Sequence, residues 1–147
     1  MKRGEIWLIS LDPTIGAEIK KTRPAIIVNN DHLGKLPLKV IVPLTDWKER
    51  YAIAVWMVQI IPDKQNKLSK TSAADCFQIR SVSENRFIKK VGIISLNQLE
   101  KIQFAITQVL SISNTSQKWT SISRILFPKI LMITPEFGYT NVTGFLL

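Results

Sequence analysis

Hydrophobic positions in the N-terminal part of the chain fall into short runs that are separated by Gly, Pro, Asn and Asp residues. The run at 5–11 alternates, the run at 24–28 is continuously apolar, and the run at 38–44 is rich in β-branched residues. The predicted strands are residues 5–11, 24–28, 38–44, 52–61, 72–79 and 90–94. Because no helical segment separates them, they predict a small barrel of short strands rather than a parallel sheet.

The spacing of apolar positions then changes to that of a helix. Ser95 and Gln98 have the spacing of a capping box, in which a hydroxyl and an amide bind backbone N–H groups of the first turn. The apolar positions that follow fall on one helical face; they are Leu96, Leu99, Ile102, Ile106, Val109 and Leu110. The pattern predicts a long amphipathic helix at about residues 95–112 that packs on the barrel.

From Ser113 the chain has a polar linker and then an apolar, nearly uncharged segment without clear periodicity. We therefore expect a domain at residues 1–112 and an atypical apolar C-terminal extension at 113–147. This extension could add strands to the barrel, extend a dimer interface, or be the translated product of a shifted or lost stop codon.

The composition of the 147 residues, 46% hydrophobic and 21% charged, is that of a folded protein with a sizeable core. The 20 Lys and Arg residues exceed the 11 Asp and Glu residues and give a net charge of +9, which suits a polyanionic partner. Membrane surface, acidic protein and nucleic acid all fit that charge. The single cysteine, Cys76, cannot form an internal disulfide. With a charged N-terminus and no long apolar stretch, the chain is expected to be cytoplasmic, without a membrane span.

Several segments match, in order along the chain, the motifs of one known family. They are Gly4–Leu8 (GEIWL), Asp12–Glu18 (DPTIGAE), Lys21–Val28 (KTRPAIIV), Val42–Thr45 (VPLT) and Gln78–Arg80 (QIR). Over residues 1–112 the chain closely resembles the PemK/MazF toxin family. The resemblance implies a mainly β fold with α, an SH3-like small barrel of short antiparallel strands with a terminal helix, and usually a homodimer. It also implies a toxin of a toxin–antitoxin system that cleaves single-stranded RNA at short sequences without a metal.

In metal-free RNA cleavage, the ribose 2′-hydroxyl attacks the neighbouring phosphorus and leaves 2′,3′-cyclic phosphate and 5′-hydroxyl ends. The protein must hold the phosphate, stabilise the added negative charge and move two protons. Arg23 suits the charge because its planar fork can meet two phosphoryl oxygens, whereas its pKa above ~12 makes it a poor general base. Thr45 matches a family threonine whose hydroxyl donates to a phosphoryl oxygen. Without the resemblance, Arg23 would read as a solvated loop residue and Thr45 as a turn residue.

The resemblance also directs attention to Glu18 and Gln78. Glu18 could accept the proton of the 2′-hydroxyl, although a loop glutamate is more often solvated. Gln78 has an amide that can read a base edge or a phosphate. Two family features are missing, because Ala17 replaces a histidine of some relatives and Phe77 replaces an aspartate of others.

Lys20 and Lys21 form a basic cluster with Arg23 and are candidates for RNA binding, although such clusters are usually solvated surface. Trp47 follows Thr45 in a loop and is the aromatic residue predicted to stack on a base. No set of side chains suggests a metal site, and no cofactor is expected. The resemblance implies an antitoxin partner, which we expect to be acidic and partly disordered.

A competing hypothesis is a non-catalytic binding module on the same barrel, since a related toxin of this fold poisons DNA gyrase. The discriminating feature is the pair of Arg23 and Thr45, because a binder has no need to place both on one phosphate. A further hypothesis is an inactivated toxin, in which the C-terminal extension covers the loop that carries Arg23.

Overall fold

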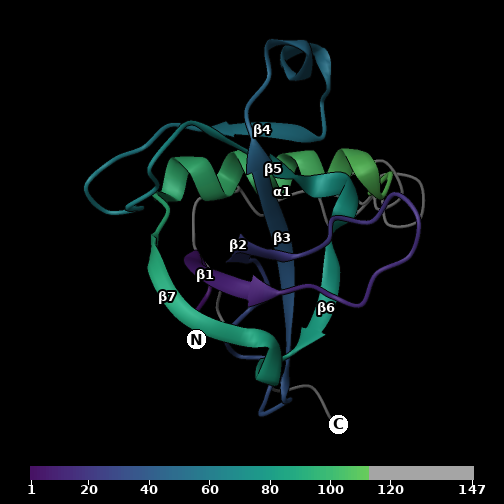
Figure 1. Cartoon of the computed structure of the whole chain (residues 1–147), viewed down its shortest axis with the longest axis vertical. Coiled ribbons are helices and arrows are strands. Elements are labelled where there is room, and N and C mark those ends of the chain that lie inside the picture. Colours follow the sequence, from purple (N-terminus) through teal and green to yellow (C-terminus); the bar gives the residue numbers. More distant parts are fainter. Residues whose placement is uncertain (113–147) are drawn as a thin grey trace, which may run out of the picture. The chain divides into compact units, whose positions relative to one another are not determined.

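Within residues 1–112, the part of the chain that this computed structural model describes, seven strands form one antiparallel sheet (Figure 1). The strands are β1 (Glu5–Ser10), β2 (Thr22–Ile27), β3 (Leu38–Asp46), β4 (Met57–Ile60), β5 (Ser72–Asp75), β6 (Arg80–Ser83) and β7 (Phe87–Ile93). Three short 3-10 helices, η1 (Glu49–Ile53), η2 (Cys76–Gln78) and η3 (Glu84–Arg86), connect strands, and one helix, α1 (Leu96–Val109), follows them. The strand order is β4-β5-β3-β2-β1-β7, and β6 pairs with β3.

The long strand β3 organises the sheet. One of its edges pairs with β2, and the other pairs first with β6 and then, further along, with β5. Val28 N donates to Val40 O at 2.9 Å, so even-numbered residues of β3 direct their backbone groups towards β2. Pro43, which has no N–H, therefore faces the opposite edge, in the gap between the β6 and β5 pairings. The proline removes a donor where no partner strand needs one.

The mainly β fold with one terminal helix is confirmed, and the expected SH3-like barrel is approximately right. Within residues 1–112 the sheet curves but does not close, because β4 and β7, at the two ends of the strand order, do not pair with each other. The pairing of β1 with β7 shifts register twice. Such irregularities bend a strand and increase its twist, and Figure 1 shows β7 as a long curved arc.

The sheet buries side chains on both of its faces. The cluster under α1 contains Ile6, Ile26, Val28, Val42, Leu44, Val58, Ile60, Ala74, Cys76, Ile94, Ile102 and Ala105. The cluster on the other face contains Ile9, Leu11, Ala25, Ile27, Ile41 and Val82. Neighbouring residues of β2 thus point into different clusters, and this explains why the run at 24–28 has no polar alternation.

The structure corrects several predicted strands. The strand predicted at 90–94 is β7, which begins earlier, at Phe87. In the predicted strand at 52–61 only Met57–Ile60 is extended, and Ile53, in the 3-10 helix before it, is 92% exposed. The candidate strand at 72–79 ends at Asp75, where η2 begins, and β6 was not predicted.

Helix α1 confirms the predicted capping box at Ser95 and Gln98. Ile102 is fully buried as predicted, whereas Leu96, predicted on the packing face, is 79% exposed. Cys76 is buried in the core, and burial, reinforced by the Asp75 charge, raises the pKa of its thiol to about 12. No helix within residues 1–112 is long and apolar enough to cross a membrane.

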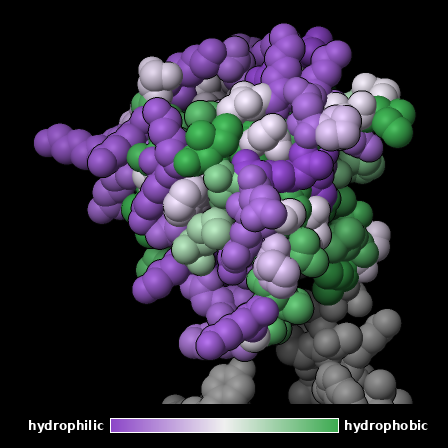
Figure 2. Space-filling view, turned by 60° about the horizontal axis from the view of Figure 1, so that its bottom comes forward, coloured by the Kyte–Doolittle hydropathy of each residue, from purple (hydrophilic) through white to green (hydrophobic). Residues whose placement is uncertain are grey.

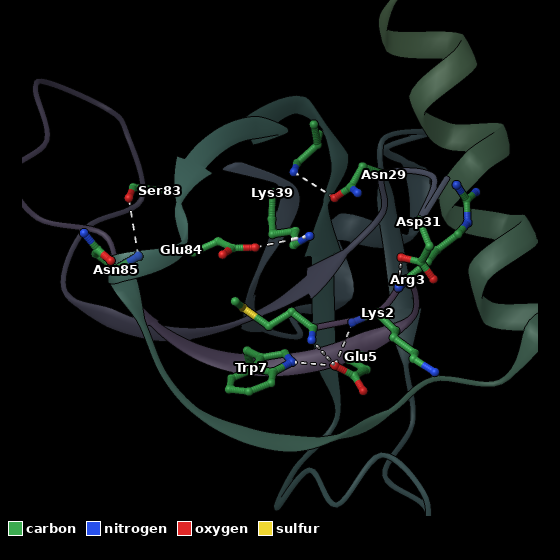
Figure 3. A network of polar contacts seen from close by, with 12 residues as sticks. Lys2, Arg3, Glu5, Trp7, Asn29, Asp31, Lys39, Ser83, Glu84 and Asn85 are labelled. Atoms are coloured by element: carbon green, nitrogen blue, oxygen red, sulfur yellow. Dashed lines mark hydrogen bonds and ion pairs between the residues drawn. The ribbon is translucent and has the colours of Figure 1, made fainter. Parts of the chain in front are cut away.

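A polar network at the N-terminus involves the buried carboxylate of Glu5 (Figure 3). Its oxygens accept hydrogen bonds from Lys90 Nζ at 2.6 Å, from Lys2 N at 2.9 Å and from Trp7 Nε1 at 2.9 Å. Burial by itself raises the pKa of Glu5, but the bonds from Lys90, Lys2 and Trp7 outweigh that effect and lower the pKa from 4.5 to about 2.

We predict that this carboxylate makes stability depend on pH in acid. Because the folded pKa lies below the ordinary value, the stabilisation is present above about pH 4.5 and is lost as the pH falls towards 2. Glu5→Gln is expected to lower the free energy of unfolding at pH 7 by about 2 kcal/mol and to flatten its decline between pH 5 and pH 3. Denaturant titrations at several pH values test this, with Glu100→Gln on the exposed side of α1 as the matched control.

Candidate active site at the ends of β2 and β3

Arg23 and Thr45 lie two residues beyond the last recorded pair of β2 and β3. Ala25 pairs with Pro43, so the same register continued by two residues pairs Arg23 with Thr45. Opposite residues of antiparallel strands share a face and have Cβ atoms about 5 Å apart. Both residues are half-buried, and Thr45 is held on its other side by pairing with Ala73 of β5. A single phosphate can therefore contact both side chains.

Positive charge surrounds the end of β3. The carboxylate of Asp46 accepts an ion-pair hydrogen bond from Lys70 Nζ at 2.8 Å. This bond lowers the pKa of Asp46 against the opposing effect of burial, and the charges of Lys70, Arg23 and Lys48 lower it further. The guanidinium of Arg23 thus lies close enough to Asp46 to act on its ionisation. Three cations around one carboxylate leave a local surplus of positive charge, as a phosphate site requires.

Gln78 holds the loop that joins β1 to β2. Its Oε1 accepts a hydrogen bond from Ile19 N at 2.6 Å, and its Nε2 donates to Ala17 O at 3.1 Å. Figure 1 shows this loop running beside β6 and η2. Gln78 was predicted to contact RNA, and in this structure its amide is occupied by the backbone of the loop.

Arg80 holds the same loop from β6. Its Nη2 donates to Ile19 O at 2.8 Å, and its Nη1 lies 3.6 Å from Glu18 Oε2. Its Nε is buried and has no hydrogen-bond partner among residues 1–112. Glu18, the predicted proton acceptor, is therefore paired with an arginine, while its side chain stays 54% exposed.

The predicted RNA-binding residues lie in two places. Lys20 and Lys21 are exposed on the loop, and Lys20 O accepts a hydrogen bond from Arg23 Nε at 3.2 Å. Trp47 packs within its own segment, with Nε1 donating to Glu49 Oε1 at 3.2 Å and its ring edge-on to Tyr51 at 6.1 Å. The structure thus brings the loop lysines to Arg23 and directs the Trp47 ring towards η1.

An open cleft of about 470 Å3 lies beneath the loop. It is lined by Ile15, Ala17, Glu18, Phe77, Gln78, Ile79 and Arg80. Sequence reasoning did not assign a function to Phe77 or Arg80, although the alternation of Gln78 and Arg80 around Ile79 was a signal that both face one side. Within residues 1–112, no three His, Cys, Asp or Glu side chains gather where they could hold a metal ion.

One face of the molecule is mostly hydrophilic. Figure 2 shows this face, from the lower end of Figure 1, with separate hydrophobic patches. The net charge of the chain, +9, agrees with such a surface. Long-range attraction of a polyanion therefore acts over more of the molecule than the cleft alone.

Comparisons with known proteins agree with the resemblance seen in the sequence. A family model described as the PemK-like, MazF-like toxin of type II toxin-antitoxin systems matches residues 2–110. Endoribonuclease MazF9 of Mycobacterium tuberculosis is 29% identical over 113 residues, covering 72% of this chain and 92% of the relative. Endoribonuclease MazF of Staphylococcus saprophyticus is 32% identical over 106 residues, which cover 72% of this chain and 88% of that relative. A solved mycobacterial endoribonuclease in complex with its cognate antitoxin has the same fold, with a TM-score of 0.59, 18% identity and coverage of 77% of this chain and 97% of that one.

Proposed function

Because this chain belongs to the PemK-like, MazF-like toxins of type II toxin–antitoxin systems, we propose that it is a sequence-specific, metal-independent endoribonuclease of single-stranded mRNA that inhibits translation and growth. Its relatives in Mycobacterium tuberculosis and Staphylococcus saprophyticus are named endoribonucleases. Those names favour catalysis over a non-catalytic binding module on the same fold.

The β2–β3 register, which extended by two residues sets Arg23 opposite Thr45, carries this proposal. The phosphodiester lies between the two side chains, where the guanidinium fork and the hydroxyl donate to its non-bridging oxygens. The 2′-oxygen forms a bond to phosphorus, the bond from phosphorus to the 5′-oxygen breaks, and the products are a 2′,3′-cyclic phosphate and a 5′-hydroxyl. Arg23 stabilises the negative charge that the phosphate gains in the transition state.

Glu18 takes the proton of the 2′-hydroxyl, and the departing 5′-oxygen takes up a proton from water. The side chain of Glu18 is 54% exposed, which supports its role as proton acceptor. For this step the carboxylate of Glu18 must first separate from Arg80. Lys20 and Lys21, exposed on the same loop, attract the phosphates on either side. Gln78 and Trp47 hold flanking bases. To do so, the amide of Gln78 gives up its hydrogen bonds to the loop backbone and forms hydrogen bonds with the edge of a base.

The proposal includes the partners and the organisation of the chain. We expect a cytoplasmic homodimer that is neutralised by an acidic antitoxin, as a solved relative is found with its cognate antitoxin. Residues 1–112 form the endoribonuclease domain, in agreement with the span of the family match. Residues 113–147 are an apolar extension, and the roles considered for it, including inactivation, fall outside the described residues.

The reaction itself is tested by incubating the protein with single-stranded RNA in excess chelator. We expect cleavage to leave 2′,3′-cyclic phosphate ends that resist 3′-end ligation until a phosphatase removes them, and 5′-hydroxyl ends that a kinase can label. A single 2′-deoxy sugar at the cleaved position is expected to stop cleavage there, because the attacking oxygen is missing. Cleavage that persists at the deoxy position, or 5′-phosphate products, would contradict the mechanism.

A further inference from the structure

We propose that the cleft beneath the β1–β2 loop is a nucleobase subsite, in which one unpaired base of the RNA stacks on Phe77. The inference rests on the proposed function, since it names where the base next to the cleaved phosphate is held. The cleft has an apolar wall, formed by Ile15, Phe77 and Ile79. It also has polar side chains, those of Glu18, Gln78 and Arg80, at its rim. This combination suits a flat aromatic ring with a hydrogen-bonding edge.

Phe77 is an exposed aromatic ring on a well-anchored backbone. Its side chain is 67% exposed, although the rest of η2 follows the buried end of β5. Phe77 N donates to Asp75 Oδ1 at 3.2 Å, and Cys76 N donates to Trp56 O at 2.9 Å. Because these bonds fix the backbone at the start of η2, stacking a base on this ring costs little backbone entropy.

Trp56 supports the ring of Phe77 from one side. Their centroids lie 6.1 Å apart with an interplanar angle of 60°, an edge-on contact. A base can stack on the exposed part of the ring, and such base–aromatic stacking is a common way to hold single-stranded RNA. Trp47, the aromatic residue expected from the sequence, makes a similar edge-on contact with Tyr51.

The cleft adjoins the phosphate site through two consecutive carbonyls of the loop. Ile19 O accepts a hydrogen bond from Arg80 Nη2, and Lys20 O accepts one from Arg23 Nε. Consecutive residues have Cα atoms about 3.8 Å apart, so the two guanidinium groups are anchored on the same short stretch of the loop. In the sheet, Arg80 pairs with Ile41, which lies on the same face as Ala25 and hence as Arg23. A nucleotide whose phosphate contacts Arg23 can therefore place its base in the cleft.

The charged and amide groups of the rim favour RNA over an apolar protein segment as the occupant. An apolar segment would leave the Arg80 guanidinium and the Glu18 carboxylate without new partners when it covered them. A base brings donors and acceptors on its edge as well as an apolar face.

Binding without cleavage is the direct test. The probe is a fluorescent, random-sequence pool of short 2′-O-methyl RNA, which lacks the attacking hydroxyl, and its affinity is measured by anisotropy in chelator. Phe77→Ala is expected to weaken binding about tenfold, the effect of losing one base–aromatic stack. Phe77→Tyr is expected to retain wild-type affinity because it keeps the ring. Phe104→Ala on α1, where the ring is 65% exposed, is the matched control and is expected to bind as wild type does.

Crosslinking locates the base. The same RNA carrying 5-iodouridine is irradiated with the full-length protein, and the adduct is mapped by mass spectrometry. An adduct at Phe77 supports the subsite. Adducts found only at other residues would overturn it. So would an unchanged affinity of Phe77→Ala for the RNA, or a wild-type protein that does not bind the RNA at all. Phe77→Ala that loses the dimer but keeps its affinity for RNA would also overturn it, and would identify a protein contact.

These outcomes are separable from the fate of the proposed function. If Phe77→Ala binds as wild type does while the wild type leaves cyclic phosphate ends, the subsite is wrong and the nuclease stands. If the adduct forms at Phe77 but the wild type does not cleave RNA, the subsite stands and the nuclease is wrong.

Discussion

Replacing Arg23 by alanine is expected to lower kcat for RNA cleavage about a hundred- to a thousandfold, the effect of removing one donor that stabilises transition-state charge. Arg23 is half-buried at the end of β2, outside both core clusters, so its removal should leave the fold intact. KM is expected to change much less, because Lys20 and Lys21 still attract the RNA. Steady-state kinetics on a short RNA with a defined cleavage site measure both constants.

Two further variants show which property of the Arg23 side chain accounts for the loss of activity. Arg23→Lys keeps the charge but loses the planar fork, and we expect it to recover only part of the rate. Lys101→Ala removes one positive charge from the exposed side of α1 and is expected to cleave RNA as wild type does. Equal kcat values for Arg23→Ala and Lys101→Ala would remove Arg23 from the chemistry.

Gly92→Ala is expected to destabilise the fold by at least about 3 kcal/mol, the largest effect on stability that we predict. A Cβ at Gly92 would stand 2.5 Å from the carbonyl oxygen of Gln65 and would also clash with the carbonyl of Asn66. These backbone atoms cannot move away by rotation of a side chain. Gln65 O also accepts a hydrogen bond from Ile93 N at 3.1 Å, and Asn66 is fully buried, so the segment is fixed against β7.

Thermal and denaturant unfolding of Gly92→Ala measure this effect, with a midpoint expected to fall by more than about 10 °C. Lys89→Ala is the matched control, because it adds no atom and lies exposed on the same strand. A Gly92→Ala protein within 1 kcal/mol of wild type would show that the 65–66 segment can move away from β7 at little cost.

Strong local patterns predicted their elements. The runs at 5–11, 24–28 and 38–44 became β1, β2 and β3 with small changes at their ends, and Ser95 began the helix. The segment at 80–83 was missed because it offers one buried side chain, Val82, among polar neighbours. The segment at 52–61 was misread because its apolar residues include Ile53 and Val55, which the structure exposes to solvent.

The site could be predicted only where the family motifs specify it. Arg23 and Thr45 were identified by resemblance, and the register of β2 and β3 supplies a physical reason for their proximity. The contacts of Arg80 with the β1–β2 loop join residues 61 apart in sequence. No local pattern encodes such a pairing, because it depends on where the sheet brings β6. The part of the cleft formed by Phe77 could likewise be recognised only once the fold was known.

The central claim is that Arg23 and Thr45 act together on one phosphate, and a double-mutant cycle tests it most directly. kcat/KM is measured for the wild type, Arg23→Ala, Thr45→Ala and the double variant on the same RNA in chelator. Groups that stabilise the same transition state are strongly non-additive, so we expect the double variant to be much less impaired than the product of the two single losses. Losses that multiply, with no coupling between the two positions, would contradict the account.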